Sequence, residues 1–287
     1  MHWEFLLNLS QKKSLDKNPI RGLEGYGTYN MPPGTWSDDS SMTIATMSSI
    51  VNRQGIDYDD IMSEFLQWLE NGNYTQYNHV FDIGNTTLAG LKNYKKGIDP
   101  VLCGGDDVRD NGNGSLMRIL PLAFVPDITY DVIENVSALT HRHAVSKIAC
   151  VFYVEIARSM LSNDLSIDEH VNSVAGKIKE YYKDFEELEY FNNIFNDNLD
   201  DVKSGGYVID TFESVVHCLK NTGNYRDAVL KAVNLGEDTD TVAAICGGLA
   251  GIYYGFDDIP SEWIDGVPEL DRVMKICESY CEYCYEH

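Results

Sequence analysis

The sequence is short of positive charge. Its 287 residues include 22 Lys and Arg against 45 Asp and Glu, a formal net charge of −23. Binding to nucleic acid or to an anionic membrane surface rests on clustered cations, so this composition excludes bulk binding to either. No run of about 18 apolar residues occurs, which excludes a membrane-spanning helix. Residues 1–13 also lack the basic leader and long apolar core that are typical of a signal peptide.

A disulfide framework is also missing. The seven cysteines are an odd number at scattered spacings, a pattern that indicates reduced thiols in a cytoplasmic protein, which we expect to be a monomer. Cys277, Cys281 and Cys284 match the spacing of a radical-SAM cluster motif. Such a motif belongs near the start of a barrel, so we interpret these residues as incidental cysteines of a C-terminal helix.

Period-two strand patterns of useful length are absent as well, and helical patterns dominate. Ile44, Met47, Ile50 and Val51 recur at steps of three and four, as one buried helix stripe requires. Residues 8–37, rich in Gly, Pro and Asn, are expected to be irregular. The sequence therefore predicts one all-α domain over residues 1–287, with further helices at 56–70, 116–124, 130–139, 145–161, 167–182, 208–219, 227–234 and 241–254, the last small-residued and central.

Two acidic segments each precede an apolar helix. The first is Ser37-Asp38-Asp39-Ser40, and the second is Gly236 to Thr241, in which Asp238 and Asp240 are separated by one residue. Either could be a simple helix cap. Oxygen-only donor sets of this kind suit Mg²⁺, Mn²⁺ or Ca²⁺, so together they predict one site for two hard cations. Asp238 to Val242 also fits the start of a haloacid-dehalogenase phosphatase motif, but too little chain follows for that fold.

A glycine-rich turn and a histidine pair lie between these segments. Gly112 to Arg118 forms a turn expected to enter a helix, where exposed amides could hold a phosphate or could be purely structural. His141 and His143 are two residues apart and cannot share a helix face, so a zinc pair is not expected. One of them is placed to hydrogen-bond a sugar or another substrate group.

Four tracts, GYGTYNMPPGTWSDDSSMT, NGNGSLMRILPLA, THRHA and AVNLGEDTDTVAAICGGLAGIYYG, have the order and approximate spacing of those in ADP-ribosylglycohydrolases. The chain resembles this family from about Glu4 to Trp263. The resemblance implies an all-α orthogonal bundle with a binuclear Mg²⁺ or Mn²⁺ centre that hydrolyses the glycosidic bond between ADP-ribose and a modified group. It implies metal ligation by Ser37, Asp38, Asp39, Asp238, Asp240 and Thr241, and substrate binding by Asn113, Gly114, Ser115, His141 and Tyr207.

One departure concerns the start of the chain. Family members open with a GDALG helix followed by a stretch ending in Glu-Phe, and here Met1 begins just before that pair, Glu4 and Phe5. Either the start is misassigned or this is a short form with a weakened site. By resemblance, Glu4 or Asp39 takes the proton of the attacking water. The expected substrate is an ADP-ribosylated protein, above all on arginine, or a small ADP-ribosyl compound. The alternative is a non-catalytic relative that binds ADP-ribose.

Overall fold

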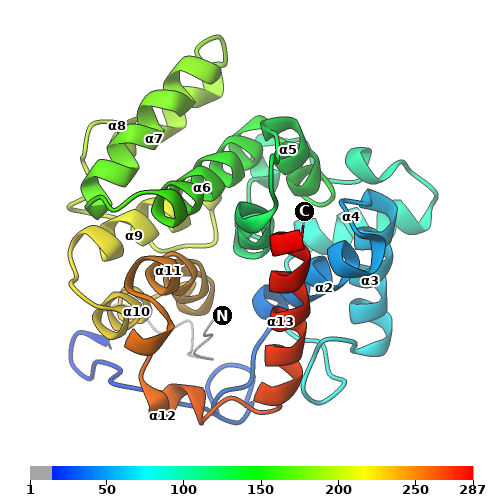
Figure 1. Cartoon of the computed structure of the whole chain (residues 1–287), viewed down its shortest axis with the longest axis horizontal. Coiled ribbons are helices and arrows are strands. Elements are labelled where there is room, and N and C mark those ends of the chain that lie inside the picture. The colour runs from blue at the N-terminus through cyan, green and yellow to red at the C-terminus, as the bar shows by residue number, and fades with distance from the viewer. Residues whose placement is uncertain (1–14, 287) are drawn as a thin grey trace.

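The computed structural model describes residues 15–286, and helices make up most of it (Figure 1). The α-helices are α2 (Asp38–Arg53), α3 (Tyr58–Asn71), α4 (Asn85–Lys95), α5 (Tyr130–Ala138), α6 (Ala144–Ser162), α7 (Ile167–Tyr181), α8 (Asn192–Phe195), α9 (Val208–Lys220), α10 (Tyr225–Val233), α11 (Thr239–Tyr254), α12 (Ser261–Ile264) and α13 (Leu270–Glu286). Short 3₁₀ turns are η1 (Pro100–Leu102), η2 (Val108–Asp110), η3 (Leu116–Arg118), η4 (Leu120–Phe124), η5 (Glu186–Phe191) and η6 (Phe256–Asp258). β pairing within residues 15–286 is limited to two isolated bridges, Gly105 with His141 and Gly112 with Tyr207. The predicted all-α fold is confirmed.

Helix α11 is largely buried, as its apolar, small-residue composition predicts, and lies beside α10 (Figure 1). It packs against α10, α9 and α6. A Cβ atom at Gly247 would lie only 3.1 Å from the Tyr225 hydroxyl, so glycine allows α10 to approach closely. The buried Tyr153 of α6 donates its hydroxyl to the Ile245 carbonyl of α11 over 2.9 Å. These contacts hold α11 in place. Its N-terminal end carries the second acidic segment.

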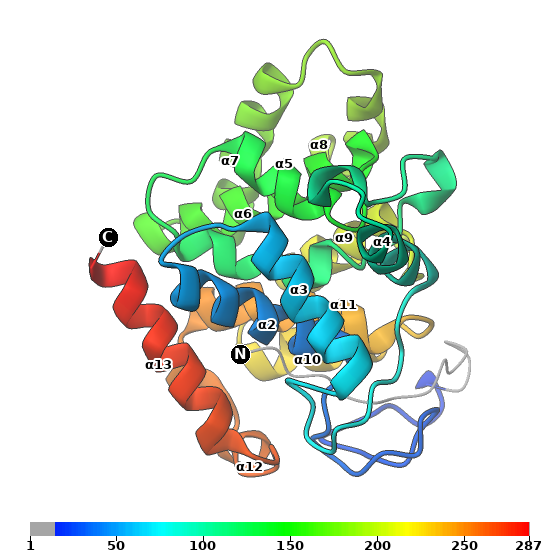
Figure 2. The same ribbon diagram turned by 90° about the vertical axis from the view of Figure 1, so that its right-hand side faces the viewer.

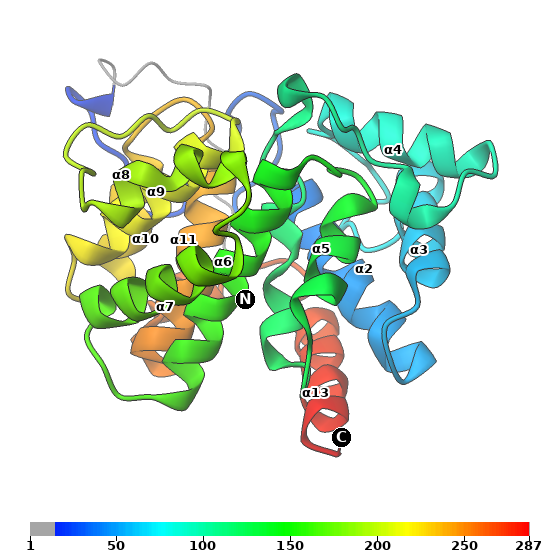
Figure 3. The ribbon, with the colours of Figure 1, turned by 90° about the horizontal axis from the view of Figure 1, so that it is seen from above.

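The remaining helices form two groups. Seen from above, α6 to α11 gather on one side and α2 to α5 on the other (Figure 3). Helix α13 returns across the bundle to pack along α2 (Figure 2). The Tyr280 hydroxyl of α13 donates to the Pro121 carbonyl over 2.7 Å. The N-terminal ends of α2 and α11 come from different groups, so any site that they share lies where the groups meet.

Two local predictions differ from the structure. Residues 116–124 were expected to form one helix, but they form the 3₁₀ turns η3 and η4, with Pro121 near the start of η4. Proline lacks the amide donor that a continuous α-helix needs there. Helix α4 was not predicted, because only Thr87, Gly90 and Leu91 of its eleven residues are buried, which leaves a weak apolar pattern.

The structure also shows the state of the cysteines and the apolarity of the helices. All seven cysteines are free thiols. Four of them are buried in the bundle, at Cys103, Cys150, Cys218 and Cys246. Among the helices of the described chain, none combines the length and apolarity that crossing a membrane requires.

Candidate active site

The first acidic segment forms the N-terminal tip of α2. A turn through Pro33 and Gly34 leads to Ser37, which precedes the first residue of the helix. Asp38 is 5% exposed and Asp39 is fully buried. The Ser37 hydroxyl donates to Asp39 Oδ2 over 3.0 Å. Both carboxylates therefore lie at the positive end of a 16-residue helix, where the helix dipole stabilises negative charge.

The second acidic segment forms the N-terminal tip of α11. Gly236 and Glu237 both have a positive φ, 93° and 59°, which turns the chain sharply into the helix. The Asp238 amide donates to the Ser204 carbonyl over 3.0 Å and fixes this turn. Asp240 and Thr241, in the first turn of α11, are each 6% exposed. The sequence-predicted oxygen donors are therefore buried at both tips except Asp238, which is half-buried.

A residue that the sequence did not single out lies near the second tip. Asp82, in the loop between α3 and α4, accepts a hydrogen bond from the Tyr29 hydroxyl. Burial raises the pKa of Asp82, and the nearby charge of Asp238 raises it further, while the side chains of Tyr29 and Asp240 partly offset both effects. Burial and the charges of Asp82, Asp240 and Asp38 likewise raise the pKa of Tyr29. Carboxylates of both tips, Asp38 and Asp240, therefore act on the same tyrosine hydroxyl.

Asp82 was missed because its sequence context carries no pattern. It is a single acid in an irregular loop, with a positive φ of 60°. The loop lies against the segment before α2 (Figure 2), and Trp36 Nε1 donates to the Tyr74 carbonyl over 2.8 Å. The Tyr29 and Phe81 rings also pack at 5.3 Å. Only the tertiary contacts between these two loops bring Asp82 to the site.

The donor set fits a hard cation in its chemistry. All the candidate donors are carboxylate or hydroxyl oxygens, which Mg²⁺ and Mn²⁺ prefer. Burying several carboxylates together is costly unless positive charge compensates them. Within residues 15–286, no three His, Cys, Asp or Glu side chains are near enough to one another to form a ready-made metal group. Glu4, the other predicted acid, lies outside the described residues.

The glycine-rich turn is held at the start of α9. The backbone N–H of Asn113 donates to the Gly206 carbonyl, and the backbone N–H of Val208 donates to the Asn111 carbonyl, both over 3.0 Å. This pairing sets Gly112 beside Tyr207, the residue before α9. Burial raises the pKa of the half-buried Tyr207 to about 12. The predicted loop and the predicted aromatic residue are therefore neighbours.

Asn113 joins this loop to the second acidic tip. Its Nδ2 donates to Asp238 Oδ2 over 2.7 Å and to Thr211 Oγ1 over 3.0 Å. The loop then enters η3, which is three residues long, rather than the helix that the sequence predicted. Such a short turn has little dipole, so any phosphate binding here rests on the loop amides themselves.

The two predicted histidines have different positions. His143 caps α6 and contacts the Asn111 side chain at 3.0 Å. His141 is 2% exposed and lies against the loop, where a Cβ atom at Gly114 would come within 2.9 Å of its ring and 2.8 Å of the Thr87 hydroxyl. Only glycine fits at position 114. Burial, and secondarily the charge of Arg118, lowers the pKa of His141 to about 3, so its ring is neutral.

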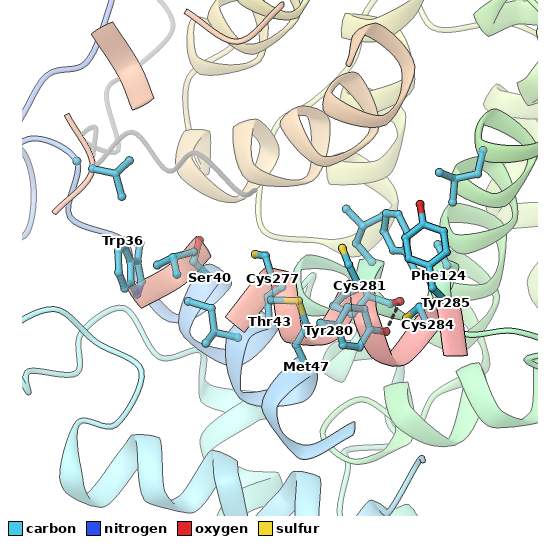
Figure 4. Close-up of a pocket in the computed structure, with 18 residues that line it drawn as sticks. Trp36, Ser40, Thr43, Met47, Phe124, Cys277, Tyr280, Cys281, Cys284 and Tyr285 are labelled. Carbon is cyan, nitrogen blue, oxygen red and sulfur yellow. Dashed lines mark hydrogen bonds between the residues drawn. The ribbon is translucent and has the colours of Figure 1, made fainter. Parts of the chain in front are cut away.

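An apolar groove of about 490 Å³ runs between α2, η4 and α13 (Figure 4). Trp36 and Ser40 line the end beside the α2 tip, and Tyr285 lines the far end. The groove also contains the C-terminal thiols that resemble a cluster motif: Cys277, Cys281 and Cys284. All three belong to α13, the C-terminal helix in which the sequence places them.

The sequence model of the ADP-ribosylglycohydrolase family matches residues 1–287. An ADP-ribosylarginine hydrolase Tri1 from Serratia proteamaculans (strain 568) is 29% identical over 278 residues, covering 92% of this chain and 71% of the relative. An ADP-ribosyl-[dinitrogen reductase] glycohydrolase from Rhodospirillum rubrum is 28% identical over 249 residues, covering 85% and 77%. A solved structure titled ADP-ribosylglycohydrolase-related protein complex has the same fold, with a TM-score of 0.79 at 23% identity, covering 99% of this chain and 92% of that one. The chain belongs to the ADP-ribosylglycohydrolase family.

Proposed function

We propose that this protein hydrolyses the glycosidic bond between ADP-ribose and a modified group, with ADP-ribosylated arginine as the acceptor linkage. The observation that carries the proposal is the 2.7 Å contact between Asn113 and Asp238, which joins the candidate phosphate loop to a candidate metal tip. Two relatives that match most of the chain bear the names of ADP-ribosyl hydrolases acting on arginine and on dinitrogen reductase. We infer that the substrate is an ADP-ribosylated protein or a small ADP-ribosyl compound, met by a cytoplasmic monomer.

Six residues of the two tips are proposed to hold two divalent cations, Mg²⁺ or Mn²⁺. They are Ser37, Asp38, Asp39, Asp238, Asp240 and Thr241. When bound, such cations supply Lewis acidity, which orients ribose hydroxyls and acidifies a water molecule. Asp82 adds a further carboxyl near Asp238 and Asp240.

The protein's own groups carry the remaining tasks. The backbone amides of Gly114 and Ser115 bind the diphosphate, which the net charge of −23 would otherwise repel. Asn113, whose own N–H donates to the Gly206 carbonyl, holds the loop in place for that contact. His141, facing Gly114, binds an oxygen of the same ligand, and Tyr207 covers it from the start of α9.

The reacting carbon lies toward the acidic tips. The Asp39 carboxylate, or that of Glu4, accepts a proton from the attacking water. Positive charge develops on the anomeric carbon as the bond to the leaving group breaks, and the surrounding carboxylates stabilise it. The loop with its amide donors thus binds the diphosphate, and the acidic tips surround the reacting bond.

The test is hydrolysis of an ADP-ribosylated arginine peptide with Mg²⁺ or Mn²⁺, followed by chromatography of released ADP-ribose. The proposal predicts metal-dependent release by the wild type and none by Asp240→Asn, while the exposed control Asp184→Asn remains active. Calorimetry with ADP-ribose runs in parallel. Binding without release identifies a non-catalytic ADP-ribose-binding protein, and absence of both contradicts the proposed site.

A further inference from the structure

Arg118 is a fully buried cation that the proposed reaction does not use. Burial lowers the pKa of its guanidinium only to about 10, so it stays charged at neutral pH. Its Nη2 donates to the Val136 carbonyl over 3.1 Å and to Thr140 Oγ1 over 2.8 Å, and its guanidinium carbon lies 4.8 Å from the centre of the Phe65 ring. Nε and Nη1 have no hydrogen-bond partner within the described chain. Burying a charge without a carboxylate partner costs folding free energy, so a functional role for Arg118 is expected.

Thr140 connects this cation to His141. Thr140 is fully buried, and its Oγ1 lies 2.8 Å from His141 Nδ1 as well as 2.8 Å from Arg118 Nη2. A guanidinium can only donate, so the Thr140 oxygen is the acceptor of that hydrogen bond. The oxygen has a second lone pair, so the contact with His141 has two possible directions. In the direction on which the proposal rests, the hydroxyl proton is donated to His141 Nδ1, which then carries no proton of its own.

The other ring nitrogen of His141 faces the glycine-rich loop. A Cβ atom at Gly112 or at Gly114 would lie 3.4 Å from Nε2. The ring is neutral, and with Nδ1 as the acceptor the ring proton is on Nε2. This nitrogen thus presents an N–H donor to whatever the loop binds.

We propose that Arg118 and Thr140 are positioning residues that hold His141 as an Nε2–H donor toward an acceptor oxygen of a ligand bound at Gly112 to Gly114. The proposal rests on the proposed function, since that ligand is ADP-ribose and the oxygen belongs to its diphosphate or ribose. Arg118 acts through Thr140 and does not touch the ligand. Its fixed charge also keeps a second proton off the imidazole, so the donor tautomer persists without becoming imidazolium.

The experiment compares Thr140→Val with Thr140→Ser. Valine keeps the shape but removes the hydroxyl, whereas serine keeps the hydroxyl. Long-range ¹H–¹⁵N NMR of ligand-free protein identifies the protonated nitrogen of His141, whose signal is assigned by its loss in His141→Asn. The wild type and Thr140→Ser are expected to show Nε2–H, and Thr140→Val a mixture of tautomers. Calorimetry is expected to show about tenfold weaker ADP-ribose binding by Thr140→Val only, as loss of an oriented donor to a charged acceptor implies.

A second variant removes the cation instead. Arg118→Met fills the same volume without a buried charge, so it should fold, and it is expected to weaken ADP-ribose binding and to mix the His141 tautomers. Protonation of His141 at Nδ1 in the wild type overturns the proposal, as does an unchanged tautomer and affinity in Thr140→Val. Failure of the wild type to bind ADP-ribose contradicts the proposed function instead, and the ligand-free spectra distinguish that failure from this one.

Discussion

The side-chain amide of Asn113 donates a 2.7 Å hydrogen bond to the carboxylate of Asp238, which lies 125 residues further along the chain. One residue belongs to the glycine-rich loop and the other to the N-terminal tip of α11. This contact makes one site of two segments that a sequence alone shows as separate motifs. It fixes the orientation of the Asp238 carboxylate, and it holds the loop at the depth of the acidic tips.

Replacing Asn113 should therefore damage both halves of the site. In Asn113→Ala the carboxylate loses an amide donor, and we expect losses of about 1.5–3 kcal/mol in ADP-ribose and Mn²⁺ binding, the range for hydrogen bonds to charged groups. Isothermal calorimetry measures both. Asn196→Ala, at an exposed position, is the matched control and should bind normally. Equal affinities in the two variants would show that the contact has no role in binding.

Asp82 should contribute to cation binding. Its carboxyl lies in contact with Tyr29 and under the influence of Asp238 and Asp240. Asp82→Asn removes a carboxylate from near the α11 tip, so Mn²⁺ affinity is expected to fall about tenfold, or about 1.4 kcal/mol. Titration of Mn²⁺ into the apo-protein checks this value against Asp184→Asn. An affinity unchanged by the Asp82 substitution would place this residue outside the metal site.

Gly114 should tolerate no side chain. A Cβ atom there would approach Thr87 Oγ1 to 2.8 Å and the His141 ring to 2.9 Å. Gly114→Ala is therefore expected to lose ADP-ribose binding while the bundle stays folded. Gly176→Ala in α7 meets no neighbour within 4 Å, and it should stabilise the protein by roughly 0.5–1 kcal/mol, because alanine is the better helix former. Calorimetry and urea unfolding separate the two effects, and normal ligand affinity in Gly114→Ala would contradict the placement of the loop.

His141 should make stability depend on pH in the acidic range. Its pKa is lowered to about 3 in the folded protein from 6.5 in the unfolded chain. The unfolded state therefore binds the additional proton between these values, so the contribution of His141 to stability is complete above pH 6.5 and is lost as the pH falls toward 3. The slope from this residue is at most about 1.4 kcal/mol per pH unit.

Urea unfolding of the wild type and of His141→Asn across pH 4–7 isolates this contribution. The difference in unfolding free energy between the two proteins is expected to narrow or reverse as the pH falls. Carboxylates elsewhere titrate in both proteins and cancel in the comparison. A difference that stays constant from pH 7 to pH 4 would mean that His141 is not held neutral.

The fold was predictable where burial leaves a periodic pattern. The stripe of Ile44, Met47 and Ile50 marks α2, and the small apolar residues of α11 mark a buried helix. Helix α4 escaped because its buried face is narrow, and η4 replaced a helix because Pro121 lacks an amide donor. Local sequence patterns thus predict elements best where one face of a helix is widely buried.

The site was predictable only in part, for a related reason. Asp38, Asp39, Asp238 and Asp240 stand out because two acidic segments, each before an apolar helix, together supply an oxygen-only donor set. Asp82 reaches them through loop packing, and Arg118 reaches His141 through the hydroxyl of Thr140, neither of which leaves a mark in sequence spacing. Residues that act through tertiary contacts could be identified from the structure but not from the sequence.

The most direct test of a single site is a crystal structure of the protein with Mn²⁺ and ADP-ribose, recorded at a wavelength where manganese scatters anomalously. We predict anomalous peaks between the tips of α2 and α11, with the diphosphate on the backbone amides of Gly114 and Ser115 and the distal part of the ligand beside Tyr207. Manganese elsewhere, or a nucleotide bound in the apolar groove along α13 instead of on the loop, would contradict the account.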